Sequence, residues 1–398
     1  MLVALALLLG VSWGPGAGKV RPWAFLAFNM VLLATWFGGN WRGGAICLIF
    51  ALVVYALIHL SRSRSHLWMF SLLALVGFLF LVKYDYPSWL PHAYRGGIWT
   101  RTMKAWLGIP DLKVTLGLSY LCFRLLHVHI EYRNGNLARV DLLPFLNYVF
   151  FVPVSLAGPI NLYEPFQRDL ATPPRLDGGE FYLAIRRIVL GLAKKVLVAG
   201  LISPYILGSL EPDGPHPFLL LTLAAVGYSI YIYADFSGYT DIAIGLGRLF
   251  GIRLPENFDR PFLATNLQDF WARWHMTLTN WIRTYVFYPL NLFLTRRRPD
   301  HGKLLNPVLT VLVSFLLIGM WHGNQWNFVA FGLMHGIGIA FLLVLRRFRP
   351  APREGYSGFS LWWRRAATFL FVSYSFILFV YPLGDIPWLL GRALGLGS

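Results

Sequence analysis

The segment GMWHGNQWNFVAFGLMHG, residues 319–336, decides the fold because it sets a polar turn between two apolar runs. The runs cover residues 307–320 and 326–345, and the turn between them carries His322 and two amide side chains. Ionisable and polar groups are costly in a bilayer and usually mark a pathway or a reacting centre there. The segment therefore predicts two membrane helices that meet at a functional turn.

A second stretch, FWARWHMTLTNW at residues 270–281, places His275 among tryptophans. A capping-box pattern at residues 265–268 starts a helix and Pro289 would end it, so we expect one helix over about 266–288. At about 100° per residue, its apolar face holds Trp271, Trp274, His275, Leu278, Ile282 and Tyr285. Its opposite face holds Arg273, Thr277, Asn280 and Thr284. His275 is therefore expected on the aromatic face.

The three histidines of these stretches admit different interpretations. His275 fits either a core histidine with one hydrogen bond or a residue of a helix that lines a water-accessible cavity. His322 fits either a general base, which takes a proton from a hydroxyl and returns it to a leaving group, or part of a helix-cap cluster at the membrane surface. His335 lies on an otherwise apolar helix, which favours structural packing.

Composition excludes an ordinary soluble enzyme. Of the 398 residues, 57% are hydrophobic and 13% are charged, whereas a soluble domain has about 25% charged residues. The net charge of +17 comes from Lys and Arg scattered over short loops, which is typical of topology determinants and headgroup contacts rather than of nucleic-acid binding. Cys47 and Cys122 lie far apart in apolar runs and predict no disulfide. No zinc, P-loop or nucleophile-elbow motif occurs, so no metal is expected.

The remaining apolar runs indicate a polytopic all-α protein. They fall at residues 2–11, 23–37, 45–60, 68–82, 181–207, 218–234 and 366–381. With the two runs above and the apolar stretches at 115–135 and 148–170, they predict roughly ten to eleven membrane segments. Some would be re-entrant because they are shorter than the ~20 residues of a full span. We expect residues 2–11 to be a retained first segment, 84–110 an interfacial connector, and the end of the chain a short Gly/Leu tail.

Two places should interrupt helices. The Gly158-Pro159 step should break one, because proline and its predecessor disfavour helical backbone. After residue 234 the apolar pattern is interrupted by Asp235, Ser237, Tyr239 and Asp241, so a re-entrant or broken helix is expected there. These four side chains are candidates for a polar substrate lining.

Four motifs carry a resemblance to a known family. They are GPINLYEPFQ (158–167), DFSGYTDIAIGLGRLFGIRLPENFDRPF (235–262), FWARWHMTLTNWIRTYVFYPL (270–290) and the opening segment. The chain from about Val114 onward resembles the membrane-bound O-acyltransferase family, in its bacterial polysaccharide-modifying branch. The sequences of these motifs are most similar to those of the alginate O-acetylation group, and next most similar to those of the group that transfers D-alanine to teichoic acid.

The resemblance implies a fold and a site. The fold would be a helical bundle around a central tunnel, in a single domain over 1–398, with variable helices at 1–110, a catalytic core at 111–345 and C-terminal helices at 346–398. The catalytic residues would be His322 and His275. Thr284 departs from the acidic residue that relatives commonly have in this run, so no carboxylate role is assigned there.

The same resemblance supplies the expected chemistry. An acyl group, in the first instance acetyl, would pass from acetyl-CoA or another acyl thioester to a polysaccharide, with no bound cofactor. Transfer would be direct or through a periplasmic or extracellular acetyltransferase partner, by a multi-pass protein of the bacterial inner membrane. The donor would be carried by CoA or an acyl carrier protein, and no nucleic acid is involved. The expected substrate-binding residues are Trp271, Trp274, Asn280, Trp321, Asn324, Trp326, Asp235, Ser237, Tyr239 and Asp241.

Two interpretations from other classes compete with the acyltransferase. A proton-coupled transporter could use the same intramembrane polar residues, but it would predict inverted repeats with paired broken helices, and none is visible. A non-catalytic membrane scaffold would need no histidine cluster. Both are less favoured than an O-acyltransferase that transfers groups other than aminoacyl groups.

Overall fold

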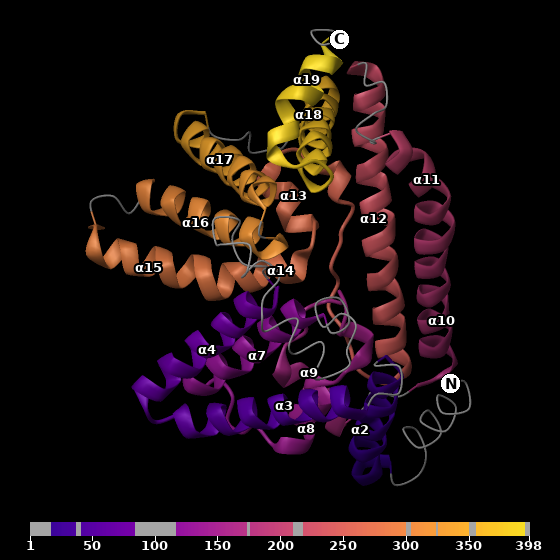
Figure 1. The fold of residues 1–398 in the computed structure, drawn as a ribbon, viewed down its shortest axis with the longest axis vertical. Helices are drawn as coiled ribbons and strands as arrows, with labels where there is room; N and C mark the ends of the chain where they lie inside the picture. Colours follow the sequence, from indigo (N-terminus) through magenta and orange to yellow (C-terminus); the bar gives the residue numbers. More distant parts are fainter. Residues whose placement is uncertain are drawn as a thin grey trace, which may run out of the picture. The chain divides into compact units, whose positions relative to one another are not determined.

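The computed structural model describes residues 17–36, 41–83, 117–172, 176–209, 218–299, 304–323, 325–349 and 356–394. Within these ranges every regular element is a helix (Figure 1). The predicted all-α class is therefore confirmed for this part of the chain. The expectations for residues 2–11 and 84–110 concern segments outside the described residues.

The chain divides into two compact units. Unit 1 comprises Met1–Gly191 and Tyr239–Pro255, and unit 2 comprises Leu192–Gly238 and Glu256–Ser398. The predicted single domain, with its core at 111–345, stays a prediction.

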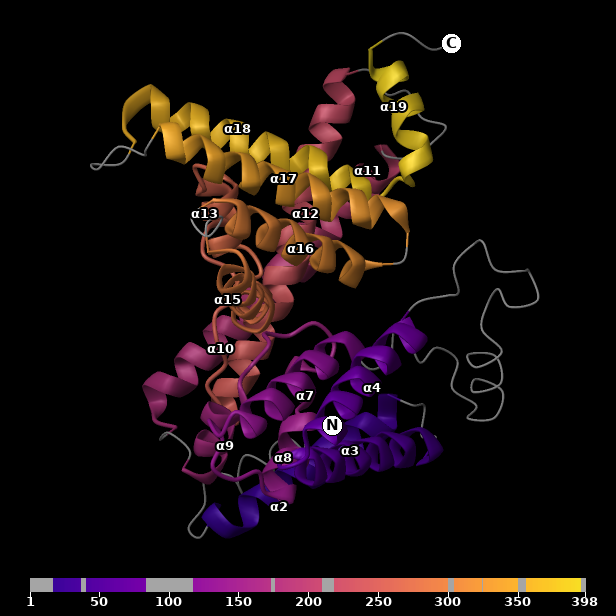
Figure 2. The ribbon, with the colours of Figure 1, turned by 90° about the vertical axis from the view of Figure 1, so that its left-hand side faces the viewer.

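Unit 1 is a helical bundle. Its helices are α2 (Ala17–Trp36), α3 (Trp41–Ser61), α4 (Ser65–Lys83), α7 (Leu118–Arg133), α8 (Leu142–Val149), α9 (Tyr163–Ala171) and all but the last residue of α10 (Gly178–Leu192). Helices α3, α4 and α7 pack against one another (Figure 2). The Gly158-Pro159 step lies between the 3-10 turn Val152–Val154 and α9, outside any helix, so the predicted break is confirmed.

A buried arginine ties the first helix of unit 1 to its last segment. Arg21, on α2, donates through Nη1 to the carbonyl oxygens of Asp169 and Leu170 at 2.7 Å each. Its Nη2 donates to the carbonyl oxygen of Phe250 at 2.5 Å. A buried cation is tolerated where its donors are hydrogen-bonded, and these carbonyls supply the bonds.

Unit 2 holds the two histidine-containing motifs, residues 270–281 and 319–336. Its helices are η3 (π-helical, Ala193–Ala199), α11 (Gly200–Ser209), the first part of α12 (Phe218–Leu249), α13 (Leu267–Arg273), α14 (Met276–Ile282), η5 (π-helical, Arg283–Phe287), α15 (Tyr288–Arg297), α16 (Leu305–His322), α17 (Trp326–Phe348), α18 (Gly358–Phe376) and α19 (Ile386–Ala393). Helices α16, α17 and α18 form a stack (Figure 2).

Helix α12 is longer than the sequence predicts. It continues without a break from Phe218 to Leu249, through the polar residues that were expected to interrupt it. The expectation of a re-entrant or broken helix is wrong because these carboxylates have partners: Asp235 pairs with Lys195, and Asp241 pairs with Arg187. Pairing lowers the cost of a charge on a helix in apolar surroundings.

Two further boundaries differ from expectation. The helix expected to stop at Pro289 continues past it, because the π-helical turn η5 precedes α15, which has Pro289 in its first turn. A wide turn relieves the crowding between a proline ring and the carbonyl one turn earlier.

The expected Gly/Leu tail contains α19, whose Leu389 and Ala393 join a buried cluster with Leu221 of α12. Burial of its apolar side stabilises this short helix.

Four helical segments of the described chain are long and apolar enough to cross a membrane: Gly178–Ile206, Phe218–Leu249, Leu305–His322 and Trp326–Phe348. A fifth candidate is the pair Gly358–Phe379 and Leu383–Ala393, bent by 117°. Shorter apolar helices occur at Val20–Leu32, Leu48–Ser61 and Ser65–Gly77. The count of roughly ten to eleven segments and the central tunnel stay predictions.

Helices α16 and α17 approach closely because glycines face each other. A Cβ added to Gly332 would lie 2.3 Å from the carbonyl oxygen of Phe315, and one added to Gly319 would lie 2.3 Å from that of Phe328. Only the absence of a side chain permits this backbone contact. The contact holds the α16–α17 hairpin closed at the end that carries His322.

Replacing Gly332 with Ala should open this hairpin. The added methyl group meets backbone rather than a movable side chain, and overpacking of this kind costs about 1–3 kcal/mol. We expect a lower thermal unfolding midpoint for the detergent-solubilised protein, measured by tryptophan fluorescence. Gly391→Ala on α19 is the matched control, because nothing lies within 4 Å of the added Cβ. Equal midpoints for the two variants would contradict the contact.

Candidate functional site

His275 lies at a break between two helices. Helix α13 ends at Arg273 and α14 begins at Met276, and His275 between them has a left-handed backbone with φ of 45°. The prediction of one continuous helix over 266–288 is therefore wrong, and so is the helical face assigned to His275. The predicted start is shifted by one residue, since the side chain of Asn266 accepts from the amides of Gln268 and Asp269.

Asn257 holds this break from outside the helices. Its carbonyl oxygen accepts from the amide of Met276 at 2.9 Å, and its side-chain Oδ1 accepts from the amide of Thr277 at 3.1 Å. The Thr277 hydroxyl donates to the same Oδ1 at 2.9 Å. The first amides of a helix have no partner within the helix, so Asn257 acts as the cap of α14 from an earlier loop. Thr277, expected on the polar face, is buried as a result.

The ring of His275 lies in a neutral, buried environment. Its Nδ1 is 3.2 Å from Oδ1 of Asn257. Its ring packs edge-on against Phe236, with centroids 4.8 Å apart, and against Trp321 at 6.0 Å. His275 lies outside the candidate spans, and burial lowers its pKa to about 3. The ring is therefore uncharged at pH 7.

His322 is the last residue of α16, at the turn that the sequence predicts. Its half-buried ring packs against Trp321 at 4.6 Å, Phe379 at 4.9 Å and Phe331 at 5.8 Å between centroids. Aromatic walls keep water from most of the ring. Trp326, expected to bind substrate, opens α17 and is 74% exposed. Asn324 lies outside the described residues.

Trp321 connects the two histidines. Its indole packs against the His275 ring, with centroids 6.0 Å apart, and against the His322 ring, with centroids 4.6 Å apart. The structure thus brings together His275, from the α13–α14 break, and His322, from the end of α16, around a common tryptophan. Both were expected to be neighbours in one site.

The other two predicted tryptophans line different parts of unit 2. Trp274 is buried in an aromatic cluster with Phe258, Phe270 and Phe376, at 5.1, 5.5 and 5.4 Å between centroids. Trp271 packs against the ring of Phe315 at 5.1 Å. These two side chains support the α13 segment rather than the two histidine rings at Trp321.

His335 belongs to a closed hydrogen-bond network. The indole Nε1 of Trp271 donates to its Nδ1 at 3.2 Å, and its Nε2 lies 2.9 Å from Oγ of Ser375. The Ser375 hydroxyl in turn donates to the carbonyl oxygen of Val372 at 2.7 Å. Both ring nitrogens therefore have protein partners, as a packing role requires.

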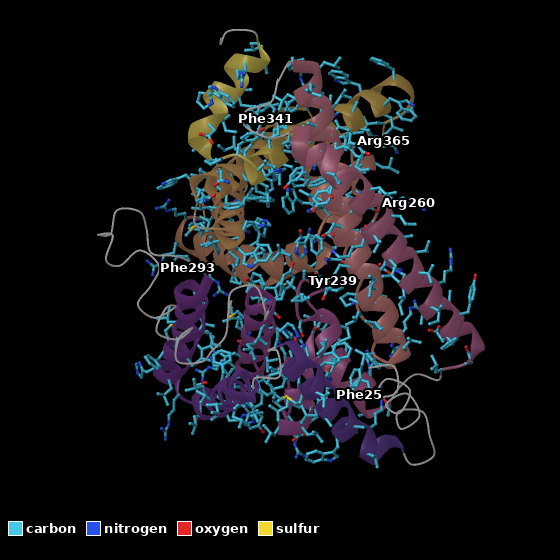
Figure 3. The ribbon with its side chains drawn as sticks, turned by 45° about the vertical axis from the view of Figure 1, so that its right-hand side comes forward. Phe25, Tyr239, Arg260, Phe293, Phe341 and Arg365 are labelled. Atoms are coloured by element: carbon cyan, nitrogen blue, oxygen red, sulfur yellow. The ribbon has the colours of Figure 1, made fainter. Side chains whose placement is uncertain are left out.

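The remaining predicted residues fall in different places. In unit 2, Asn280 is exposed and accepts from Arg283 at 3.3 Å, Asp235 pairs with Lys195, and Ser237 is buried. In unit 1, the Tyr239 hydroxyl (Figure 3) donates to the carbonyl oxygen of Pro153 at 3.0 Å. Also in unit 1, Oδ1 of Asp241 accepts from Nε of Arg187 at 2.6 Å.

Sequence reasoning missed Asn257 and Phe236. Both lie inside the motif at residues 235–262, Phe236 in DFSGYTD and Asn257 in PENFDRPF. The residues next to them in the sequence do not indicate their roles, because the partners of both are distant in the chain. Asn257 caps the helix that begins at Met276, and Phe236 packs against His275. Among the described residues, no group of three or more His, Cys, Asp or Glu side chains could hold a metal ion.

The residues around this site match a known family. Residues 109–382 match the membrane-bound O-acyltransferase (MBOAT) family, and this range includes both histidines. The chain belongs to the membrane-bound O-acyltransferase family. With several apolar helices, this member is a multi-pass membrane protein.

Curated relatives fall in the polysaccharide-modifying branch, as predicted. A teichoic acid D-alanyltransferase of Streptococcus thermophilus is 32% identical over 238 residues, 58% of this chain and 57% of the relative. A probable alginate O-acetylase of Azotobacter vinelandii is 30% identical over 298 residues, 72% of this chain and 54% of the relative. A peptidoglycan O-acetyltransferase of Helicobacter pylori is 33% identical over 245 residues, 59% of this chain and 44% of the relative. The chain thus spans about half the length of these MBOAT relatives.

Replacing Ser375 with Ala should destabilise unit 2. The change leaves the buried Nε2 of His335 without its acceptor, and an unsatisfied buried donor costs about 1–3 kcal/mol. We expect a lower thermal unfolding midpoint in detergent. Ser360→Ala on the same helix is the control, because Ser360 is exposed. If both variants unfold at the wild-type temperature, the network does not contribute to stability.

Proposed function

We propose that this MBOAT member is an O-acyltransferase of the bacterial cytoplasmic membrane. It moves an acyl group, in the first instance acetyl, from a cytoplasmic thioester to a hydroxyl of a cell-envelope or exported polysaccharide. Transfer is direct or passes through a periplasmic acetyltransferase partner. The observation that supports this most is the meeting of His275 and His322 at Trp321 in a member of this family.

The chemistry needs one group that takes up and returns a proton, and His322 fits that need. Its ring takes the proton of the acceptor hydroxyl while the oxygen attacks the thioester carbonyl carbon. The carbon–sulfur bond then breaks, and the leaving thiolate receives the proton from His322. The products are an ester and a free thiol, and the histidine returns to its starting state.

The surroundings of His322 suit a thioester donor. Water in the site would hydrolyse the thioester, and a dry cavity suppresses that side reaction. The rings of Trp321, Phe331 and Phe379 cover the His322 ring, and Phe328 stacks near it at 6.4 Å between centroids. The donor is acetyl-CoA or a carrier-protein thioester, which acts as a co-substrate rather than a resident cofactor.

A second function in the same class is D-alanyl transfer to teichoic acid from a carrier-protein thioester. It is favoured by the Streptococcus thermophilus relative, which is 32% identical, and by a second teichoic acid D-alanyltransferase from Bacillus subtilis, which is 33% identical. The same proton transfer at His322 serves either acyl group. The choice between them depends on the donor.

Replacing His322 with Ala tests the assignment. We expect acyl transfer by the purified protein to fall about 10²- to 10⁴-fold, the usual contribution of a general base. His66→Ala is the matched control, because His66 is exposed in unit 1 and should leave the rate unchanged. Full activity of a folded His322→Ala protein would overturn the assignment.

The donor can be identified with the wild-type protein in membranes. We expect free thiol to be released from acetyl-CoA in the presence of an acetylatable polysaccharide such as alginate. Release from a D-alanyl carrier-protein thioester, with none from acetyl-CoA, would select the second function. No thiol release from either donor would argue against both.

A further inference from the structure

We propose that Asn257 is a positioning residue that holds His275 as the tautomer protonated on Nδ1, so that Nε2 enters the reaction as a hydrogen-bond acceptor. The tautomer follows from the hydrogen bonds alone. Its catalytic consequence rests on the proposed acyl transfer.

The orientation of the Asn257 carboxamide is fixed by a backbone group. The amide of Thr277 can only donate, and it donates to the side-chain atom of Asn257 at 3.1 Å. That atom must therefore be the oxygen rather than the nitrogen of the carboxamide. The Thr277 hydroxyl, 2.9 Å from the same atom, can donate to it as well.

The orientation of Asn257 decides the tautomer of His275. An amide oxygen has no hydrogen to give, so the Nδ1 that lies 3.2 Å from it must carry the hydrogen. The ring is neutral, and a neutral imidazole has one protonated nitrogen. Nε2 of His275 therefore carries a lone pair.

His335 shows the opposite arrangement in the same unit. Its Nδ1 receives the indole hydrogen of Trp271, so that nitrogen carries the lone pair. Its Nε2 must then carry the hydrogen, which it donates to Ser375, whose own hydrogen goes to Val372. The fold thus sets His275 and His335 in opposite tautomers, and of these two rings it is His275 that has its lone pair on Nε2.

This tautomer restricts what His275 can do. A histidine that polarises an acyl carbonyl must donate a hydrogen to its oxygen, and a neutral His275 cannot do so through Nε2. A partner that Nε2 contacts during the reaction must be a donor, such as the acceptor hydroxyl or a protonated ring nitrogen. His275 therefore orients such a donor by accepting its hydrogen bond, and the carbonyl oxygen is stabilised by another group.

Asn257 also caps α14, so its two roles need separate variants. Asn257→Asp keeps oxygen acceptors for Thr277 and His275 and adds one ionisable proton. Thr277→Val keeps the buried shape but removes one hydrogen bond to Oδ1 of Asn257, and it leaves the bond to His275 intact. Thr277→Val is therefore the matched control for loss of stability at this place.

The pH profile of acyl transfer distinguishes positioning from structural support. Asn257, Phe236 and Trp321, which contact the His275 ring, carry no charge in the wild type. In Asn257→Asp at low pH, the added proton lies either on the His275 ring, as an imidazolium beside a carboxylate, or on the carboxyl group, which then donates it to Nδ1. In both states Nε2 carries a hydrogen. We expect kcat to fall at least 10-fold at pH 6 and to recover at higher pH, so that the acid limb moves up by at least one pH unit.

Thr277→Val should unfold at a lower temperature but keep the wild-type pH profile and a kcat within a few-fold of wild type. An Asn257→Asp profile that coincides with those of wild type and Thr277→Val would overturn the positioning role. A profile that moves equally in both variants would also overturn it, since it would then follow from the damaged cap.

A spectroscopic measurement tests the tautomer without any acyl transfer. Nitrogen-15 spectra of labelled histidine in lipid bilayers separate protonated from unprotonated ring nitrogens, and His275→Gln identifies the signals of His275 by difference. We expect Nδ1 protonated and Nε2 unprotonated at pH 7. A hydrogen on Nε2 would overturn the inference, whereas absent acyl transfer with the expected tautomer would overturn only the proposed function.

Discussion

The hydrogen bonds of Asn257 are the constraint on which the site of this MBOAT member depends. A left-handed histidine between two short helices is not a conformation that the local sequence favours. The side chain of Asn257, completely buried, satisfies the free end of α14 and the His275 ring together. The cost of the break is offset by these bonds, and the break turns the ring out of the helical repeat towards Trp321.

The second constraint is the closeness of α16 and α17. The glycine contact at Gly319 and Gly332 places the end of α16, with Trp321 and His322, against the start of α17 and its Phe331. Trp321 is then held between a histidine from a helix break and a histidine from a helix end. Both rings lie at helix ends that packing holds in place, which suits the role proposed for the pair.

The sequence predicts the helices whose positions depend on local hydrophobic burial. It does not predict the features of the backbone that depend on residues distant in the chain. The apolar runs place α16 and α17 to within a few residues, and Trp326 begins α17 as expected, because hydrophobic burial is read directly from periodicity. The continuity of α12 depends on partners such as Lys195 for Asp235, and the break at His275 depends on Asn257. Spacing along one helix contains neither, so both were predicted wrongly. The histidines themselves stand out in the sequence because their residue type is unusual in apolar surroundings.

An uncharged His275 suits the proposed reaction in apolar surroundings. A resting site that contained an ion would bear the full cost of burying an unpaired charge, which reaches several kcal/mol even after relaxation. His275 is uncharged and bears no such cost, and aromatic rings surround His322. In the proposed transfer, charge arises when the base takes the hydroxyl proton, and it then appears as a cation beside the developing oxyanion. Apolar surroundings disfavour an isolated ion but strengthen the attraction between this cation and the oxyanion. Burial therefore raises the free energy of a charged resting site more than that of the transition state.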